Sequence, residues 1–135
     1  MSLTTDIYNA FAPLVTTFAA GLSPALPVAY PNLNFDPPSE GMWLDFRTFW
    51  NGNENYGMSD SGPSIERGFF RIIVNAPAGS GQSAAQAVAE LIATAFPKGT
   101  TFNVARTDRA PEITGPIQDD PWLMIPVTIY WRATR

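Results

Sequence analysis

Hydrophobic residues recur at helical spacing in two parts of the chain. Near the N-terminus the apolar stripe consists of Ile7, Phe11, Leu14, Val15, Phe18 and Leu22. Pro13 falls inside this stripe, and we expect a kink or two short helices there, because proline removes a hydrogen bond and clashes with the preceding turn. A second, alanine-rich helix is expected from about Gln82 to Phe96. Its predicted stripe consists of Ala84, Val88, Leu91, Ile92, Ala95 and Phe96.

Alternation of apolar and polar residues predicts strands elsewhere. Residues 43–50 place Leu44, Phe46 and Trp50 on one face, which we expect to be the core face. Further strands are expected at residues 65–76, 101–106, 112–118 and 122–133. Pro126 has no N–H for a neighbouring strand, so the last strand is expected to have a free edge or a bulge near its middle. The five prolines of residues 24–38 favour an extended segment along a sheet edge.

This order of elements predicts an α+β fold. We expect a single antiparallel or mixed sheet of about four to six strands, packed by the N-terminal helix and the central alanine-rich helix. The 135 residues suit one domain, which would span residues 1–135.

Large apolar side chains on polar or ionic segments are candidates for an interface between chains. Residues 51–64 are expected to form a long polar loop, whose large apolar residues are Tyr56 and Met58. Trp43 and Phe49 share a strand face with ionic residues. Coverage by a second chain is one interpretation of that face, and coverage by the chain's own loops is the other. The candidate interface residues are therefore Trp43, Phe49, Tyr56 and Met58.

The composition removes most routes to catalysis and metal binding. The chain has no cysteine and no histidine. Disulfides, thiolate metal sites and Ser–His–Asp or Cys–His hydrolases are therefore excluded. Residues 76–83 lie between a strand and a helix as a phosphate-binding loop would, but Ala76 and Gln82 replace the required glycine and lysine. We therefore assign no catalytic, cofactor-binding or metal-ligating residue, and predict that the protein is not an enzyme.

The charge is negative and unevenly distributed. The net charge of −4 argues against a dedicated nucleic-acid binder. Residues 1–64 carry one cation and six anions, whereas residues 65–135 carry seven cations and six anions. This asymmetry suits head-to-tail contacts between identical subunits, although chance on a solvated surface explains it as well. Arg67, Arg71 and Arg106 could form a basic stripe, but ion pairing across strands is the preferred interpretation.

The succession of segments resembles the phage tail terminator-like family, which includes minor tail and tail completion proteins. The resemblance covers nearly the whole chain. It is carried by the order of the N-terminal helix, residues 27–35, the strand Arg67–Val74, the turn Ala76–Gly81, the alanine-rich helix, and the strand Trp122–Trp131 with its Pro126-Val127.

The resemblance implies a structural virion protein of a phage or prophage, without catalytic residues or cofactor. It implies a ring of six copies that caps the tail tube, ends tail polymerisation and provides the docking surface for the head connector. The implied partners are other copies of the chain, the tail tube protein and the head-connector protein. DNA would pass through without sequence-specific binding, and no membrane is involved. Assembly would occur in the host cytoplasm, and the final location would be the virion tail.

Two alternatives to the tail terminator remain open. One is another head–tail joining protein or a tail tube component, which would share the structural role. The other is a small enzyme or ligand-binding module that works with carboxylates, which would need a deep pocket holding two of them.

Overall fold

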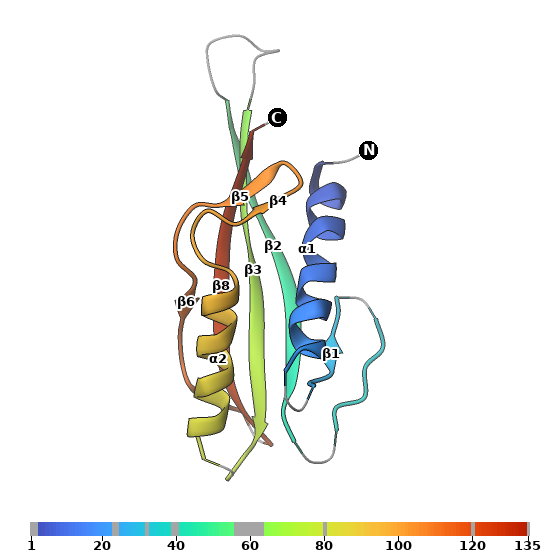
Figure 1. Ribbon diagram of the computed structural model, residues 1–135, viewed down its shortest axis with the longest axis vertical. Helices are drawn as coiled ribbons and strands as arrows, with labels where there is room; N and C mark the ends of the chain where they lie inside the picture. Colours follow the sequence, from blue (N-terminus) through green and yellow to red (C-terminus); the bar gives the residue numbers. More distant parts are fainter. Residues whose placement is uncertain are drawn as a thin grey trace.

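The computed structural model describes residues 3–22, 25–31, 33–38, 41–55, 64–79, 81–119 and 121–134. Two helices, α1 (Leu3–Ala20) and α2 (Ser83–Ala95), pack on a mixed sheet (Figure 1). The strands are β1 (Val28–Ala29), β2 (Trp43–Asn55), β3 (Ser64–Pro77), β4 (Thr101–Phe102), β5 (Ala105–Thr107), β6 (Glu112–Ile113), β7 (Ile117–Asp119) and β8 (Trp122–Thr134). The predicted α+β class is confirmed.

The sheet has eight strands rather than the predicted four to six. Its order is β1-β2-β3-β8-β5-β4, and β6 and β7 also pair with β8. The count rises because residues 101–106 and 112–118, each predicted as one strand, are each divided into two. A turn at Asn103, whose φ is 55°, lets β4 fold back onto β5. The short β1 runs parallel to β2 at the sheet edge, as the proline-rich segment predicted.

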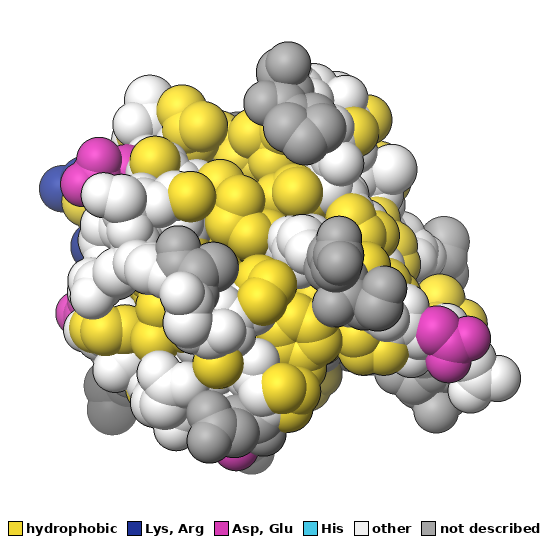
Figure 2. Space-filling view, turned by 90° about the horizontal axis from the view of Figure 1, so that it is seen from below, with side chains coloured by type: hydrophobic (Ala, Val, Ile, Leu, Met, Phe, Trp, Pro, Cys, Tyr) yellow, Lys and Arg dark blue, Asp and Glu magenta, His cyan; other side chains and the backbone are white. Residues whose placement is uncertain are grey.

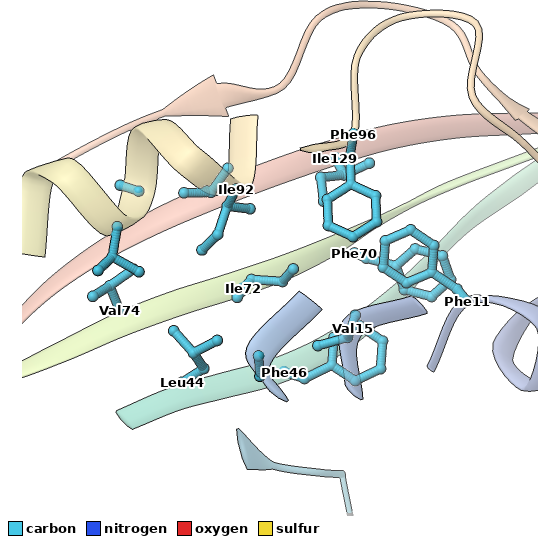
Figure 3. Packing of buried hydrophobic residues seen from close by; sticks show 14 of the residues in the cluster. Phe11, Val15, Leu44, Phe46, Phe70, Ile72, Val74, Ile92, Phe96 and Ile129 are labelled. Carbon is cyan, nitrogen blue, oxygen red and sulfur yellow. The ribbon is translucent and has the colours of Figure 1, made fainter. Parts of the chain in front are cut away.

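The core lies between the helices and one face of the three long strands, β2, β3 and β8 (Figure 3). The register aligns Phe46, Ile72 and Val127 across these strands, and all three side chains are buried. The ring of Phe11 on α1 stacks on that of Phe70, with the centroids 4.2 Å apart. The same ring lies 5.1 Å from Phe96, which follows α2, so both helices meet in one cluster.

Of the two outcomes expected at Pro13, two short helices do not occur, because α1 is a single helix from Leu3 to Ala20. Pro13 is exposed on the side of the helix away from the core. Ile7, Phe11 and Val15 are fully buried, so the helix packs on the core both before and after the proline.

The second helix was placed correctly, but its buried stripe was not. The buried residues are Ala85, Val88, Ala89 and Ile92. Ala84 is exposed and Leu91 is half exposed, although both were predicted to face the core. Because alanine occupies so many positions of this helix, the sequence pattern fits two neighbouring stripes about equally well.

Residues 51–55 and 64, predicted to belong to a long loop, are strand. Strand β2 continues to Asn55 and β3 begins at Ser64, while residues 56–63 lie outside the described ranges. The strands thus run past the ends of the helices (Figure 1). This explains why Trp50, predicted to be a core residue, is 44% exposed.

Strand β8 is central, and the free edge or bulge expected near its middle is reduced to a short interruption of pairing on one side. Pro126 pairs in register with Ile73 of β3 on one side. On the other side β7 pairs with residues 122–124 and β6 with residues 127–128. Pro126 therefore lies opposite the interruption between β6 and β7, where a missing N–H costs the ladder little.

Candidate interaction surface

The face of the sheet that points away from the helices is rich in aromatic and arginine side chains. We call it the open face, defined by Arg47, Phe49, Arg67, Phe69, Arg71, Arg106, Tyr130 and Arg132. These residues share a face because side chains paired across strands point to the same side. Phe49, Phe69 and Tyr130 form one row across β2, β3 and β8, with centroid distances of 4.7 and 5.7 Å.

Arginine side chains lie over this aromatic row. The guanidinium carbon of Arg71 is 5.3 Å from the ring centres of both Phe49 and Phe69. Its Nε donates a hydrogen bond of 3.3 Å to the Thr128 hydroxyl. At the other end of the row, Arg109 lies 4.1 Å above the Tyr130 ring. Such cation–π contacts are each worth about 0.5–1 kcal/mol at exposed sites, and they hold the arginines against the sheet.

The sheet register places arginines opposite arginines on neighbouring strands. Arg67 on β3 lies opposite Arg132 on β8, which in turn lies opposite Arg106 on β5. Arg47 and Arg71 are also directly paired. The carboxylate that neutralises Arg47 comes from its own strand, since Arg47 binds Asp45 at 2.9 Å. The basic stripe therefore exists, and it is concentrated on the open face.

A polar hollow of about 400 Å³ adjoins this stripe. It is lined by Lys98, Gly99, Arg106, Thr107, Asp108 and Arg132. The Thr107 hydroxyl donates to the Pro97 carbonyl and accepts from the Thr100 N–H, which fixes the loop carrying Lys98. Three cations and one carboxylate line the hollow, so it is suited to an anionic group of a partner.

A different kind of hollow lies at the lower end of the molecule. It has a volume of about 470 Å³ and is lined by apolar side chains that include Leu26, Met42 and Pro77. Figure 2 shows hydrophobic side chains gathered over this end. Among the residues that the structure describes, those lining this hollow are all apolar or glycine.

The candidate interface residues are not brought together by the part of the chain that is described. Trp43 and Phe49 share the open side of β2 but are six residues, or about 20 Å, apart. Trp43 packs between Phe35 and Trp122, with centroid distances of 5.0 and 5.7 Å. Phe49 belongs to the aromatic row, and Tyr56 and Met58 lie outside the described residues. The interface assignment stays a prediction.

Sequence reasoning missed Phe69, Tyr130 and Arg132 as members of the same surface as Phe49. The alternation within residues 65–76 places Phe69 and Arg71 on one face of their strand, which was a usable signal. What the sequence lacked was the register that aligns β3 with β2 and β8.

Neither a metal centre nor a membrane span emerges from the described ranges. There, no group of three or more His, Cys, Asp and Glu side chains could hold a metal ion. Likewise, no helix among these residues is long and apolar enough to cross a membrane.

Comparison with known proteins gives three findings. The model of a family described as phage tail terminator protein matches residues 6–131. A solved structure superposes with a TM-score of 0.81 at 25% sequence identity, covering 98% of this chain and 96% of that one. No curated protein matches the chain.

Proposed function

The chain belongs to the phage tail terminator family, and from this premise we propose that its copies form a ring of six that caps the tail tube. The ring ends tail polymerisation and provides the docking surface for the head connector. The family consists of structural proteins of the phage tail, so the match places this chain among them. The observation that carries the proposal is the family match over residues 6–131.

The surface of the monomer supports a role in assembly. It combines the arginine–aromatic open face with an apolar hollow at one end. Surfaces of this kind commonly mark contacts with other proteins. The proposed partners are further copies of the chain, the tail tube protein and the head-connector protein. DNA would pass through the ring without sequence-specific binding, and assembly would take place in the host cytoplasm.

The experiment that tests the proposal has two stages. Native mass spectrometry over a range of protein and Mg²⁺ concentrations, with negative-stain images, should reveal closed rings of six copies. Adding the protein to polymerising tail tube protein should then shorten the tubes and place the chain at their ends. A protein that stays monomeric at every concentration and leaves tube length unchanged would contradict the proposal.

The same experiment distinguishes a tail terminator from the two alternative structural roles. A tail tube component would extend the tubes, and a different head–tail joining protein would bind the connector without limiting tube length. No feature of the described residues favours the carboxylate-based enzyme, because among them neither the polar hollow beside the arginine stripe nor the apolar hollow at the lower end is lined by two carboxylates.

The predicted interface residues of the 51–64 segment provide a first mutational test. Replacing Tyr56 and Met58 with serine should leave the melting temperature nearly unchanged and weaken assembly, because both apolar side chains lie on a polar segment. A matched control is Val104→Ser, which removes another exposed apolar side chain, in the turn between β4 and β5. A large drop in melting temperature with assembly intact would show that the two residues belong to the core.

A further inference from the structure

We propose that the open face of one copy binds the helix layer of the next, with the arginine row Arg67–Arg132–Arg106 facing the carboxylates of Asp6 and Glu90. The helix layer is the outer surface of α1 and α2. This inference rests on the proposed ring and names the two surfaces that build it.

Two arginines of the row, Arg106 and Arg132, lie opposite one another without a counter-charge from the described residues. Like charges directly opposite one another on neighbouring strands destabilise a sheet. Arg106 and Arg132 are both exposed, and within the described ranges neither forms an ion pair. The adjoining hollow adds Lys98 to the same side of the molecule. An isolated monomer thus carries a repulsion that carboxylates of a bound partner would relieve.

The helix layer has the complementary sign. Helix α1 contains Asp6 and helix α2 contains Glu90, and neither helix contains a lysine or an arginine. The layer also has apolar side chains that face solvent, since Leu14 is 38% and Leu91 50% exposed. These leucines offer contact area for the half-buried rings of Phe49 and Phe69.

The helix layer is also hollowed where a partner would sit. A depression of about 600 Å³ lies between the helices, lined by Phe18, Leu22 and Leu91 among others. Apolar rings entering this depression would be flanked by ion pairs, which is the usual arrangement of an apolar centre within a polar rim.

The two surfaces lie on opposite sides of the same molecule, because one is the far face of the sheet and the other covers the near face (Figure 1). A contact between two different surfaces of identical chains is head-to-tail. Such a contact closes into a ring when the rotation between neighbours divides a full turn. The arrangement therefore fits a ring better than an isolated two-fold dimer, in which the same patch would meet itself.

A second copy also explains the charge balance better than nucleic acid does. The net charge of −4 disfavours binding to a polyanion, whereas it provides carboxylates for the arginine row of a neighbour.

The arginine row should show opposite effects on stability and assembly. Arg132→Glu places a carboxylate directly opposite Arg106, so the melting temperature of the monomer should stay the same or rise. The same change should weaken the contact between copies at least about tenfold. If assembly and melting temperature fall together, the row acts in folding and the proposal is wrong.

A charge swap identifies the second surface. The variant Arg106→Glu/Arg132→Glu and the variant Asp6→Arg/Glu90→Arg should each fail to assemble alone. A mixture of the two should recover mixed oligomers, measured by native mass spectrometry, or by tube length if rings form only at tube ends. Arg106→Lys/Arg132→Lys keeps the charge at the same positions and should assemble like the original chain.

Three results would overturn the inference. The first is unchanged assembly of the arginine-to-glutamate variant, and the second is a mixture that recovers nothing. The third is that the original chain binds a 30-base-pair DNA duplex, whereas the arginine-to-glutamate variant assembles normally but no longer binds the duplex. That result would assign the arginine row to nucleic-acid binding. None of these three results contradicts the proposed ring of six copies. If the original chain neither forms rings nor limits the length of the tail tubes, the proposed function is wrong as well.

Discussion

Gly68 lies on β3 at a point where two tryptophan rings meet across the helix side of the sheet. Its register partners are Trp50 on β2 and Trp131 on β8, whose ring centroids are 5.7 Å apart. A Cβ at position 68 would lie 2.6 Å from the Trp131 ring and 2.6 Å from the Phe49 carbonyl oxygen. Glycine is therefore required by the packing of Trp131, which is fully buried.

We predict that Gly68→Ala lowers the free energy of unfolding by about 1–3 kcal/mol, because either the backbone or the Trp131 ring must move. Urea unfolding at 25 °C measures this change. Gly21→Ala is the matched control, since a Cβ there has its nearest neighbour at 3.4 Å. Equal losses in the two variants would show that crowding at position 68 is not the cause.

At the scale of single elements, α1 retains a proline that its packing tolerates. A proline in a helix interior lacks the N–H that would bond to the fourth preceding carbonyl, here that of Asn9. The helix nevertheless runs without a break through Pro13. The side chain faces solvent, so replacing it disturbs no core contact.

Pro13→Ala should raise the free energy of unfolding by about 1–3 kcal/mol, because alanine restores the hydrogen bond and is the best helix former. Urea unfolding, followed by circular dichroism, provides the value. Thr17→Ala controls for helix propensity alone, and its gain should stay below about 0.7 kcal/mol. If Pro13→Ala shows no gain over this control, then α1 already accommodates the proline without loss.

For the whole molecule, Phe11 joins elements that are distant in the sequence. Its ring contacts Phe46 on β2, Phe70 on β3, Phe96 after α2 and Phe102 on β4. Figure 3 shows the rings of Phe11, Phe46, Phe70 and Phe96 between the helices and the sheet. The position of α1, and with it the outer surface of the helix layer, therefore depends on this ring.

We predict that Phe11→Ala lowers the free energy of unfolding by about 3–5 kcal/mol in one cooperative transition, as expected for a fully buried ring that leaves a cavity. Thermal and urea unfolding followed by two optical probes would check both the size and the cooperativity. Leu91→Ala removes a half-exposed side chain and should cost less than about 1 kcal/mol. Two separate transitions in Phe11→Ala would mean that α1 unfolds independently of the sheet.

The sequence by itself determined the class of the fold and much of its content. The helix at 83–95 and the long strands at 43–55, 64–77 and 122–134 could be predicted because each has a strong period of its own. The lack of histidine and cysteine limited the chemistry, and the order of segments indicated the family that the comparison confirmed. Each of these properties is local or compositional, so it can be read without knowing which elements meet.

The tertiary structure alone decided which residues share a surface. Pro126 predicted a free edge or a bulge, yet β8 is central, because the interruption between β6 and β7 accommodates the missing N–H. Arg67, Arg106 and Arg132 are 26 to 65 residues apart in sequence, and only the register of three strands aligns them in one row. Strand pairing depends on contacts between distant segments, and a one-residue shift in register would turn these side chains to the other face.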